Sequence, residues 1–238
     1  MPARQAEKNN QAKKTILIVE DHPLVRLGLT SLIEAEPDLV VCGEVGTCEA
    51  AHEAIRASAP DLVIVDLVLD GCNGLDLVKT MHAHYPEIPA LVLSMHDEAV
   101  YAERALRAGA RGYVTKKQFD ETVLLAIRRV LSGETYLSQA LEARFAQQFL
   151  AGRIPIEDSP LATLTDRQLE VFRLFGEGKT TRQIAQTLHL SIKTIESHVE
   201  HLKHKLMLDS SVELIHHATQ WVDTGRVDTG RVDTGRAS

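Results

Sequence analysis

The stretch DLVIVD at residues 61–66 decides the fold, because it is a short, β-branched apolar run that ends in a carboxylate. Similar runs flank it along the chain: TILIVE (15–20), LVVCGEV (39–45), PALVLS (89–94) and RGYVT (111–115). Their apolar residues are continuous rather than alternating, as in strands buried on both faces of a parallel sheet. Between them lie amphipathic segments; Val25, Leu29, Leu32 and Ile33, for example, share one helix face. The pattern predicts a doubly wound, five-stranded parallel sheet with helices on both sides.

Beyond residue 133 the alternation of strands and helices gives way to helices alone. A helix is predicted around Gln139–Leu150, and the polar stretch GRIPIEDSP after it is expected to be a linker. The predicted division is a disordered tail (1–14), an α/β domain (15–133), a helical linker (134–160), a small all-α domain (161–222) and a second disordered tail (223–238). The second tail continues a VDTGR repeat, which has no apolar face to bury.

Composition and charge restrict the class of protein. A hydrophobic content of 44% with 25% charged residues is typical of globular proteins, and no apolar run approaches the roughly 20 residues that cross a bilayer. The polar N-terminus lacks the apolar segment of a secretory signal, so we expect a cytoplasmic protein with no membrane partner. The net charge of −7 lies mainly in residues 15–133, whereas residues 160–222 are balanced. This asymmetry predicts two domains with different partners.

The cysteines point away from structural cross-links. Cys42, Cys48 and Cys72 are odd in number and have no CxxC spacing, so neither a disulfide framework nor a zinc site is expected. A reducing cytosol fits this pattern. Cys72 closely follows Asp66, where a thiol could respond to oxidation, but the default interpretation is a passive small residue.

Polar side chains follow the predicted strands at their carboxyl ends, where the sites of open α/β sheets form. They are Glu20 and Asp21 after the first strand, Asp66 after the third, Ser94 at the end of the fourth and Lys116 after the fifth. Three converging carboxylates need a cation between them, and oxygen ligands favour Mg²⁺. A carboxylate beside Mg²⁺ can attack a phosphoryl group, with Lys116 adding positive charge and Ser94 a hydrogen bond.

Two enzyme classes with related folds are disfavoured. A dinucleotide-binding fold needs GxGxxG after its first strand, whereas this chain has EDHPLVRLG. A haloacid-dehalogenase-type phosphatase needs DxD at its nucleophile, whereas Asp66 and Asp70 are four residues apart. The carboxylate cluster therefore predicts a phosphoacceptor site rather than one of these enzymes.

Residues 15–133 resemble the receiver domain of two-component response regulators, which has a flavodoxin-like fold. The residues that carry the resemblance are the pair Glu20-Asp21, Asp66 in LVIVDLVLDG, Ser94 in LVLSM, and Tyr113 and Lys116 in GARGYVTK. It implies that Asp66 accepts a phosphoryl group from a cognate sensor histidine kinase. It also implies that the Mg²⁺ ligands are Asp21, Asp66, the Val68 carbonyl and, through a water, Glu20.

The same resemblance implies roles for three further side chains. Ser94 and Lys116 would assist the chemistry at the phosphoryl group. Ser94 would turn toward that group and Tyr113 would rotate inward, which would change the surface around the fourth and fifth helices. These two residues would therefore form the switch.

The C-terminal segment predicts a helix-turn-helix. Helices over Thr181–Leu188 and Ile192–Leu206 are separated by a turn that contains Leu190-Ser191, with Ser191 as the N-cap. Capping boxes are predicted for Thr165 with Gln168 and for Ser210 with Glu213. One apolar stripe runs along the last helix through Ile195, Val199, Leu202 and Leu206. The opposite face is polar, as a DNA recognition helix requires.

The letters LTDRQLEV, GKTTRQIA and LSIKTIESH resemble the LuxR-type (NarL/FixJ) DNA-binding domain. The resemblance implies a helix over residues 211–222 that helps to form a dimer. The residues implied to bind double-stranded promoter DNA are Thr181, Arg182, Lys193, Thr194, Ser197, His201 and Lys205. His198 is expected to be a packed structural histidine. Glu196 and Glu200 lie near this face, where a glutamate repels phosphate but can accept a hydrogen bond from cytosine.

Together these features predict a phosphorylation-switched transcription regulator rather than an enzyme. Phosphorylation of Asp66 would favour homodimers that place two recognition helices about one turn of DNA apart. Two alternatives remain open. One is a DNA-binding protein that ignores phosphorylation and uses its receiver for dimerisation. The other is a protein-interaction regulator with a DNA surface weakened by Glu196 and Glu200.

Overall fold

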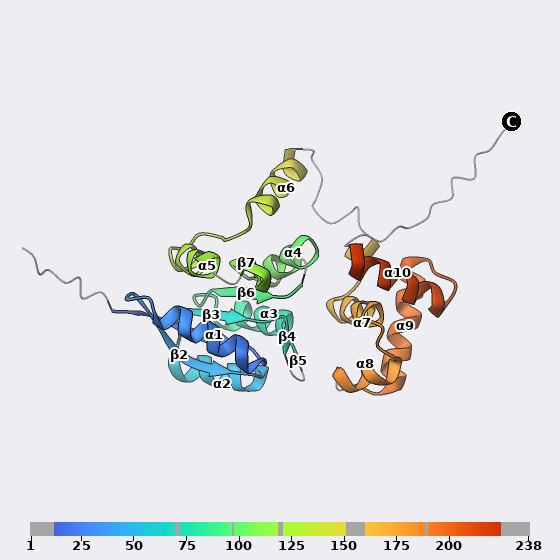
Figure 1. Ribbon diagram of the computed structural model, residues 1–238, viewed down its shortest axis with the longest axis horizontal. Helices are drawn as coiled ribbons and strands as arrows, with labels where there is room; N and C mark the ends of the chain where they lie inside the picture. The colour runs from blue at the N-terminus through green and yellow to red at the C-terminus, as the bar shows by residue number, and fades with distance from the viewer. Residues whose placement is uncertain are drawn as a thin grey trace, which may run out of the picture. The chain divides into compact units, whose positions relative to one another are not determined.

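The computed structural model describes residues 12–69, 72–96, 98–118, 121–150, 160–188 and 190–224. The chain divides into two compact units, Met1–Ser138 and Gln139–Ser238 (Figure 1). Much of the two predicted tails and the polar part of the predicted linker lie outside the described residues, at 1–11, 151–159 and 225–238. Within the described ranges, no helix combines the length and apolarity that a membrane span needs.

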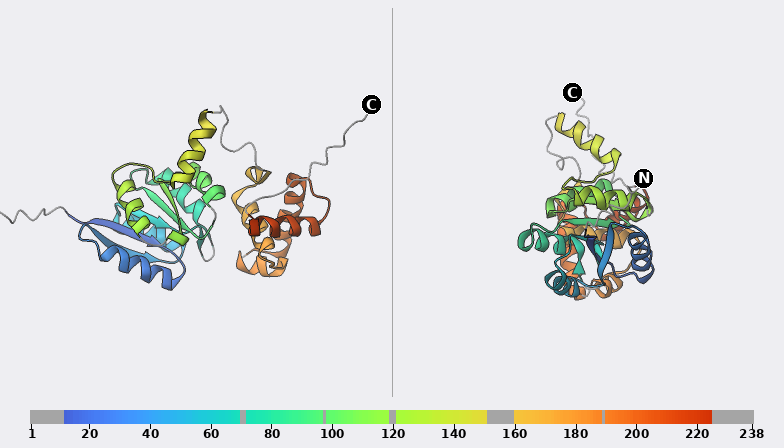
Figure 2. Two further views of the ribbon diagram at one scale, coloured as in Figure 1. Left: turned by 45° about the horizontal axis from the view of Figure 1, so that its top comes forward. Right: turned by 90° about the vertical axis from the view of Figure 1, so that its left-hand side faces the viewer.

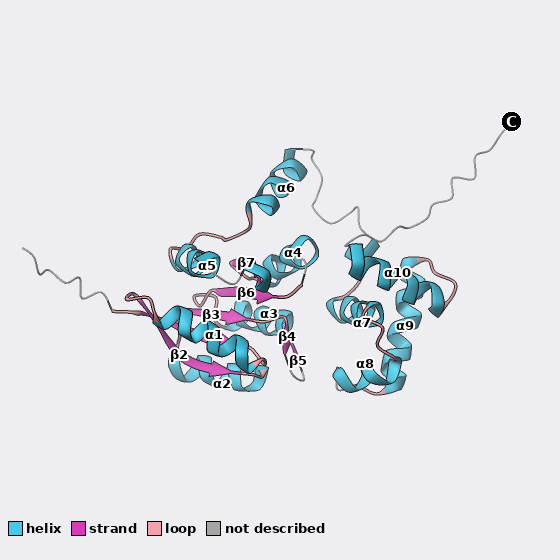
Figure 3. Cartoon of the chain, viewed as in Figure 1, coloured by secondary structure: helices cyan, strands magenta, loops and turns pink. Residues whose placement is uncertain are grey.

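The first unit is built on a five-stranded parallel sheet with the order β2-β1-β3-β6-β7 (Figure 3). Its strands are β1 (Lys14–Val19), β2 (Leu39–Val45), β3 (Leu62–Val65), β6 (Ala90–Ser94) and β7 (Gly112–Thr115). The predicted sheet is confirmed, since each of the five apolar runs forms one strand. The prediction that the strands are buried on both faces is confirmed for β3, which is buried throughout. It is wrong for β2, whose residues 40–45 are half-buried or exposed. β2 lies at one edge of the sheet, with β1 as its one strand partner among the described residues, whereas the other edge strand, β7, is bridged by Tyr136 at Gly112.

Helices cover both faces of this sheet, as the turned views in Figure 2 show. They are α1 (Pro23–Glu34), α2 (Cys48–Ser58), α3 (Gly74–His84), α4 (Glu98–Ala108) and α5 (Glu121–Leu131), with a 3-10 turn η1 (Lys116–Gln118). On one face, Leu29 and Ile33 of α1 and Ile127 of α5 share a core with strand residues such as Ile64. The neighbouring strand residue Val65, which is also fully buried, points to the opposite face because side chains alternate along a strand.

A short antiparallel hairpin, which was not predicted, follows Asp66. It consists of β4 (Val68–Leu69) and β5 (Cys72–Asn73). A disulfide joins Cys48 to Cys72, with Cα atoms 6.3 Å apart, so the expectation of no disulfide is wrong. The two cysteines are 24 residues apart, but they follow β2 and β3, whose carboxyl ends lie at the same sheet edge on either side of β1. Cys42 is an exposed free thiol.

Among its described residues, the second unit contains helices and the turns that connect them, and no strand. Its elements are α6 (Gln139–Leu150), a 3-10 turn η2 (Pro160–Thr163), α7 (Asp166–Gly176), α8 (Thr181–Thr187), α9 (Ile192–Leu206) and α10 (Ser211–Thr224). The predicted helices are confirmed, although α8 ends one residue early and α10 extends two residues further. A Cβ atom at Gly176 would lie 2.4 Å from the Ala218 carbonyl oxygen, so glycine permits the close approach of α7 and α10. The rings of Phe172 and Trp221 lie 5.7 Å apart in the same core.

Side-chain caps fix where the helices of this unit begin. Thr165 and Gln168 form the predicted capping box, and the structure adds a second one at the start of α8. The predicted capping box of Ser210 and Glu213 is half formed. The Ser210 hydroxyl accepts from the Glu213 N–H, but the Glu213 carboxylate accepts from the Asp209 N–H rather than from that of Ser210. These caps satisfy N–H groups that have no partner within the helix.

Candidate functional site

Three carboxylates meet at the carboxyl ends of β1 and β3. Glu20, Asp21 and Asp66 each place one oxygen within 4.8 Å of the others. Glu20 and Asp66 are buried and Asp21 is half-buried. The parallel register sets Val19 opposite Val65, so the residues that follow these two lie side by side. The carboxylates predicted to converge at this edge therefore do so.

Lys116 lies between two of these carboxylates. Its Nζ is 2.6 Å from Asp66 Oδ2 and 2.5 Å from Glu20 Oε2. All three side chains are shielded, with 7% of Lys116, 7% of Asp66 and 2% of Glu20 exposed. The positively charged Lys116 therefore lies at the carboxyl end of β7, as the sequence predicted.

The charges in this cluster are not balanced, because two buried carboxylates share one ammonium group. Burial raises the pKa of Glu20, and the Asp66 carboxylate adds to the rise, while Lys116 opposes it. Burial likewise raises the pKa of Asp66, again against the effect of Lys116. Burial lowers the pKa of Lys116, but the two carboxylates outweigh this effect and the pKa is raised overall. The half-buried Asp21 adds a further carboxylate at the same place.

This donor set fits a hard divalent cation. Carboxylate oxygens are the ligands that Mg²⁺ prefers, and it usually keeps several waters, so a partly exposed ligand such as Asp21 suits it. Glu20, Asp21 and Asp66 supply these oxygens within a small volume, with negative charge left over after Lys116 is counted. Val68, the implied carbonyl ligand, opens the β4–β5 hairpin two residues after Asp66.

Two supporting contacts at the site were not predicted. The Arg26 guanidinium, on the first turn of α1, donates to the carbonyl oxygens of Glu20 at 2.6 Å and Asp21 at 3.1 Å. Gly74, at the start of α3, lies directly against Asp66, since a Cβ atom there would be 2.0 Å from the Asp66 carbonyl oxygen. The Arg26 contact could have been predicted, because a basic residue follows the acidic pair closely in the sequence. Nothing in the sequence indicates the close approach of Gly74 to Asp66.

Ser94 and Tyr113, the two predicted switch residues, are connected through one backbone unit. Both side chains are fully buried. The Ser94 hydroxyl accepts from the His96 N–H at 3.3 Å, and the Tyr113 hydroxyl donates to the His96 carbonyl at 3.1 Å. The His96 ring in turn stacks on Tyr101 of α4 at 4.7 Å. The aromatic side chain of Tyr113 thus already points inward in this structure.

The second unit presents a polar face on α9, opposite the buried stripe. Ile195, Val199, Leu202 and Leu206 are the buried residues of this helix, as predicted. The positions implied to bind DNA are exposed at Arg182, Lys193, Ser197 and His201 and half-buried at Thr181, Thr194 and Lys205. Ser191 caps the helix by accepting from the Thr194 N–H at 3.1 Å, as predicted.

Not every charged residue near this face is available to a ligand. Lys205 donates to the Thr163 carbonyl at 2.7 Å and to Gln168 Oε1 at 2.9 Å, so its ammonium group braces the domain. Glu200 pairs with Lys203 at 2.9 Å, which offsets part of its negative charge. Burial lowers the pKa of the half-buried His198, and nearby positive charge lowers it further, so this histidine favours the neutral form.

Comparison with known proteins accounts for both units. Residues 16–128 match the response regulator receiver domain, and residues 162–218 match the bacterial regulatory proteins of the luxR family. The transcriptional activator protein ExaE of Pseudomonas putida is 37% identical over 205 residues, which cover 86% of this chain and 95% of the relative. This chain is a LuxR-family response regulator. The regulator is also 33% identical to the oxygen regulatory protein NreC of Staphylococcus haemolyticus, over 85% of this chain and 95% of NreC.

Solved structures agree with this assignment. The regulator is similar to RcsB from Salmonella enterica serovar Typhimurium bound to promoter rprA in the presence of the phosphomimetic BeF3⁻, with a TM-score of 0.61 and 26% identity over 87% of this chain and 98% of that one. It is also similar to a LuxR-family two-component response regulator from Aurantimonas sp. SI85-9A1, at 31% identity and a TM-score of 0.55 over 58% of this chain and 99% of that one. The chain is thus a two-component transcription regulator with a receiver and a LuxR-type DNA-binding domain.

Proposed function

We propose that phosphorylation of Asp66 by a cognate sensor histidine kinase switches this regulator between DNA-binding states. The observation that carries the proposal is the environment of the Asp66 carboxylate. It lies buried within reach of two further carboxylates, with the Lys116 ammonium 2.6 Å away. Neighbouring carboxylates destabilise a buried aspartate that has only a structural role. In a phosphoacceptor site they bind the Mg²⁺ that assists phosphoryl transfer.

In the proposed reaction, an Asp66 oxygen attacks the phosphorus of a phosphohistidine. A P–O bond forms, the P–N bond breaks, and the imidazole of the kinase leaves and takes up a proton. Bound at Asp21, Asp66, the Val68 carbonyl and, through water, Glu20, Mg²⁺ would supply charge neutralisation for the phosphoryl oxygens. Lys116 would hold a second positive charge beside these oxygens, and the Ser94 hydroxyl would donate a hydrogen bond to one of them.

The signal would then leave the site through Ser94 and Tyr113. Because the Ser94 hydroxyl now holds the His96 N–H, turning toward a phosphoryl group would break that contact and free the His96 backbone. The Tyr113 hydroxyl, bonded to the same residue, would respond together with it. This rearrangement would shift the regulator toward dimers, which couple two weak DNA sites into one tight one.

DNA binding is assigned to the polar face of α9 and the start of α8. Lys193, Thr194, Ser197 and His201 would enter the major groove, while Thr181 and Arg182 would contact phosphates. Lys205 is assigned instead to bracing this domain, because its ammonium group already has two partners. RcsB, a similar protein, is bound to promoter DNA in the presence of a phosphomimetic, which supports the same role here. We place this activity in the cytoplasm, with residues 15–133 as receiver and 161–222 as DNA-binding domain.

The test is selection of genomic DNA fragments by the purified regulator with Mg²⁺, with and without beryllofluoride. We expect an inverted-repeat motif to be enriched only with beryllofluoride, and Asp66→Asn to abolish the difference. Asp76→Asn, at an exposed position on α3, is the matched control and should behave as wild type. Equal enrichment in both samples would contradict switching by phosphorylation. No enrichment in either would contradict DNA binding and favour a protein-interaction regulator.

A further inference from the structure

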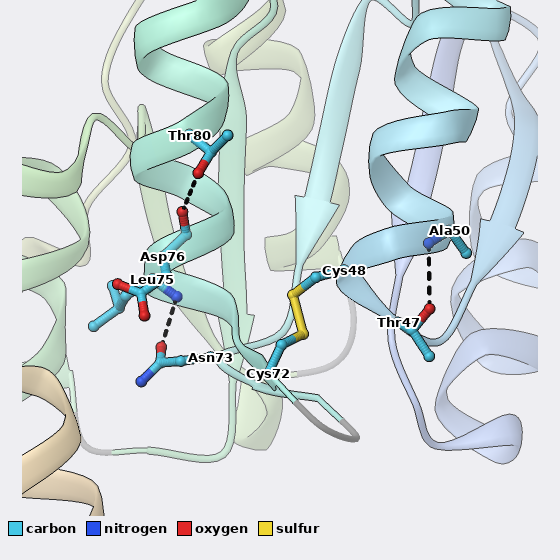
Figure 4. The surroundings of a disulfide bond; sticks show 8 residues. All are labelled: Thr47, Cys48, Ala50, Cys72, Asn73, Leu75, Asp76 and Thr80. Atoms are coloured by element: carbon cyan, nitrogen blue, oxygen red, sulfur yellow. Dashed lines mark hydrogen bonds between the residues drawn. A yellow bond between two sulfur atoms is a disulfide. The ribbon is translucent and has the colours of Figure 1, made fainter.

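The Cys48–Cys72 disulfide joins two loops that border the acidic cluster. Figure 4 shows Cys48 at the first position of α2, directly after the N-cap Thr47. Cys72 lies on the hairpin strand β5, directly before Asn73, which caps α3 through the Leu75 N–H. The bond therefore ties the N-terminus of α2 to the N-terminus of α3.

The Cys72 side of this bond leads directly to Asp66. Cys72 pairs with Leu69, and Asn73 pairs with Val68, in the hairpin. The Val68 backbone in turn hydrogen-bonds to the Asp66 carboxylate. A shift of the hairpin would therefore move both the phosphoacceptor and the backbone carbonyl proposed as a Mg²⁺ ligand.

The Cys48 side leads to the other two carboxylates. Gly46 lies two residues before Cys48, and a Cβ atom there would be 3.6 Å from the Asp21 Cα atom. The preceding residue, Val45, accepts a hydrogen bond from the Glu20 N–H at 2.9 Å. The disulfide thus spans the site, with one end anchored beside Glu20 and Asp21 and the other beside Asp66.

We propose that Cys48 and Cys72 form a reversible dithiol–disulfide pair that sets the affinity of the acidic site for Mg²⁺. This inference rests on the proposed function, because it deepens the regulation of the same site. In the forward direction the two thiols react with a low-molecular-weight disulfide, which is reduced to two thiols while the protein disulfide forms. A thiol reductant reverses the exchange through the same mixed disulfide.

The placement of the pair suits a reversible bond rather than a permanent staple. Both cysteines are half-buried, so a small thiol or disulfide can reach them. Cys48 stands at the first position of a helix, where the helix dipole stabilises the thiolate that attacks a disulfide. In the cytoplasm, where we place this regulator, disulfides are usually transient or redox-sensing.

Reduction would weaken the site because it removes the covalent link between the hairpin and α2, and the hairpin's own pairing is short. Only two residue pairs join β4 and β5 in the described residues, and so short a hairpin is not stable by itself. Without the bond, we expect the Val68 carbonyl to be less well fixed, so Mg²⁺ binding would have to order it. Fixing the backbone of one residue corresponds to about a tenfold change in an equilibrium constant, so we expect Mg²⁺ to bind about tenfold more weakly to the reduced protein.

The experiment uses the full-length protein equilibrated with oxidised or reduced glutathione. Isothermal titration calorimetry gives the Mg²⁺ affinity of each sample, and mass spectrometry of peptides from alkylated protein identifies the bonded cysteines. Cleavage after Glu44 separates Cys42 from Cys48 and makes that identification unambiguous. Cys72→Ser should bind Mg²⁺ like the reduced wild type in both buffers. Cys42→Ser, which removes the exposed free thiol, is the matched control and should retain the full redox response.

A Cys48–Cys72 peptide in the oxidised sample together with the tenfold difference would support the inference. The absence of that peptide, or an equal Mg²⁺ affinity in both redox states, would overturn it while leaving the proposed metal site intact. If neither redox state bound Mg²⁺, the proposed metal site would itself be wrong, and the inference would fall with it. The wild-type comparison needs no substitution, so a folding defect in Cys72→Ser would not obscure the result.

Discussion

Replacing Lys116 with methionine would test how the acidic cluster is stabilised before a metal binds. The substitution keeps a long side chain but removes the ammonium group that contacts Asp66 Oδ2 at 2.6 Å and Glu20 Oε2 at 2.5 Å. Both carboxylates are more than nine-tenths shielded from water, so solvent cannot replace the lost charge. We therefore expect Lys116→Met to destabilise the Mg²⁺-free receiver strongly and the Mg²⁺-loaded receiver only weakly.

The size of the effect follows from these contacts. At an effective dielectric constant of about 20, charges at such distances attract with about 6 kcal/mol each, before the cost of desolvation is subtracted. Breaking a buried ion pair costs about 3–5 kcal/mol net. Because the pKa values of Glu20 and Asp66 are raised, one of them can take up a proton in the variant rather than remain charged. We therefore expect the lower end, a loss of about 3 kcal/mol in unfolding free energy at neutral pH.

Mg²⁺ should restore most of this loss, since it supplies the positive charge that Lys116→Met lacks. A ligand that binds only the native state stabilises it according to its concentration and affinity. If the loss falls to about 1 kcal/mol in saturating Mg²⁺, linkage requires Mg²⁺ to bind the variant roughly 30-fold more tightly than the wild type. The gain in Mg²⁺ affinity would arise because the Lys116 ammonium group no longer competes with Mg²⁺ for the carboxylates of Glu20 and Asp66.

Urea unfolding followed by circular dichroism, in EDTA and in Mg²⁺, measures both quantities. Lys117→Met is the matched control, because the neighbouring lysine is exposed on the same 3-10 turn and its loss should change stability little. An equal loss for Lys116→Met with and without Mg²⁺ would refute the reasoning. It would mean that Lys116 acts through packing rather than by neutralising the two carboxylates.

Three further predictions follow from the same unit. Gly74→Ala should cost about 3 kcal/mol in thermal unfolding, because its Cβ would lie 2.0 Å from the Asp66 carbonyl oxygen, and a native-like melting temperature would contradict this close approach. Tyr113→Phe should cost about 1 kcal/mol by urea unfolding, since it removes the hydrogen bond to the His96 carbonyl; an unchanged midpoint would argue against that bond. Burial raises the folded-state pKa of Glu20 and Asp66, so in EDTA these groups favour folding at acidic pH and lose that contribution as the pH rises. The stabilisation by Mg²⁺ should therefore grow with pH in paired urea titrations, and a gap that is constant with pH would be inconsistent with the raised pKa values.

Much of the receiver could be predicted because its signals are local. A continuous β-branched run such as residues 61–66 is compatible with few structures other than a buried strand. The carboxyl ends of parallel strands meet at one edge, so Glu20, Asp21 and Asp66 could be brought together from strand positions alone. The stripe on α9 was predictable for a similar reason, since helical periodicity determines which residues share a face.

The features that escaped prediction depend on tertiary geometry. The contact of Arg26 with the acidic pair is an exception, because it is local: α1 begins two residues after Asp21 and carries Arg26 on its first turn. Lys205 lies on α9, whose polar face resembles that of a recognition helix. Its ammonium group, however, donates to Gln168 and to the Thr163 carbonyl, which are distant from it in the sequence. The pairing of Cys48 with Cys72 likewise depends on two loops that meet across β1, and not on their spacing.

If the proposed switch operates, the contacts of His96 would make the receiver respond in two states rather than gradually. Its N–H is held by Ser94 and its carbonyl by Tyr113, while its ring stacks on Tyr101 of α4. A phosphoryl group on Asp66 that drew the Ser94 hydroxyl away would break the contact between this hydroxyl and the N–H of the half-buried His96, and the loss would favour rearrangement around this residue. Because Tyr113 and Tyr101 contact the same residue, a movement of His96 would disturb both contacts. In the proposed switch, the chemistry at β3 would thereby be coupled to the position of α4 through His96, and Tyr113→Phe should weaken that coupling while leaving phosphorylation of Asp66 intact.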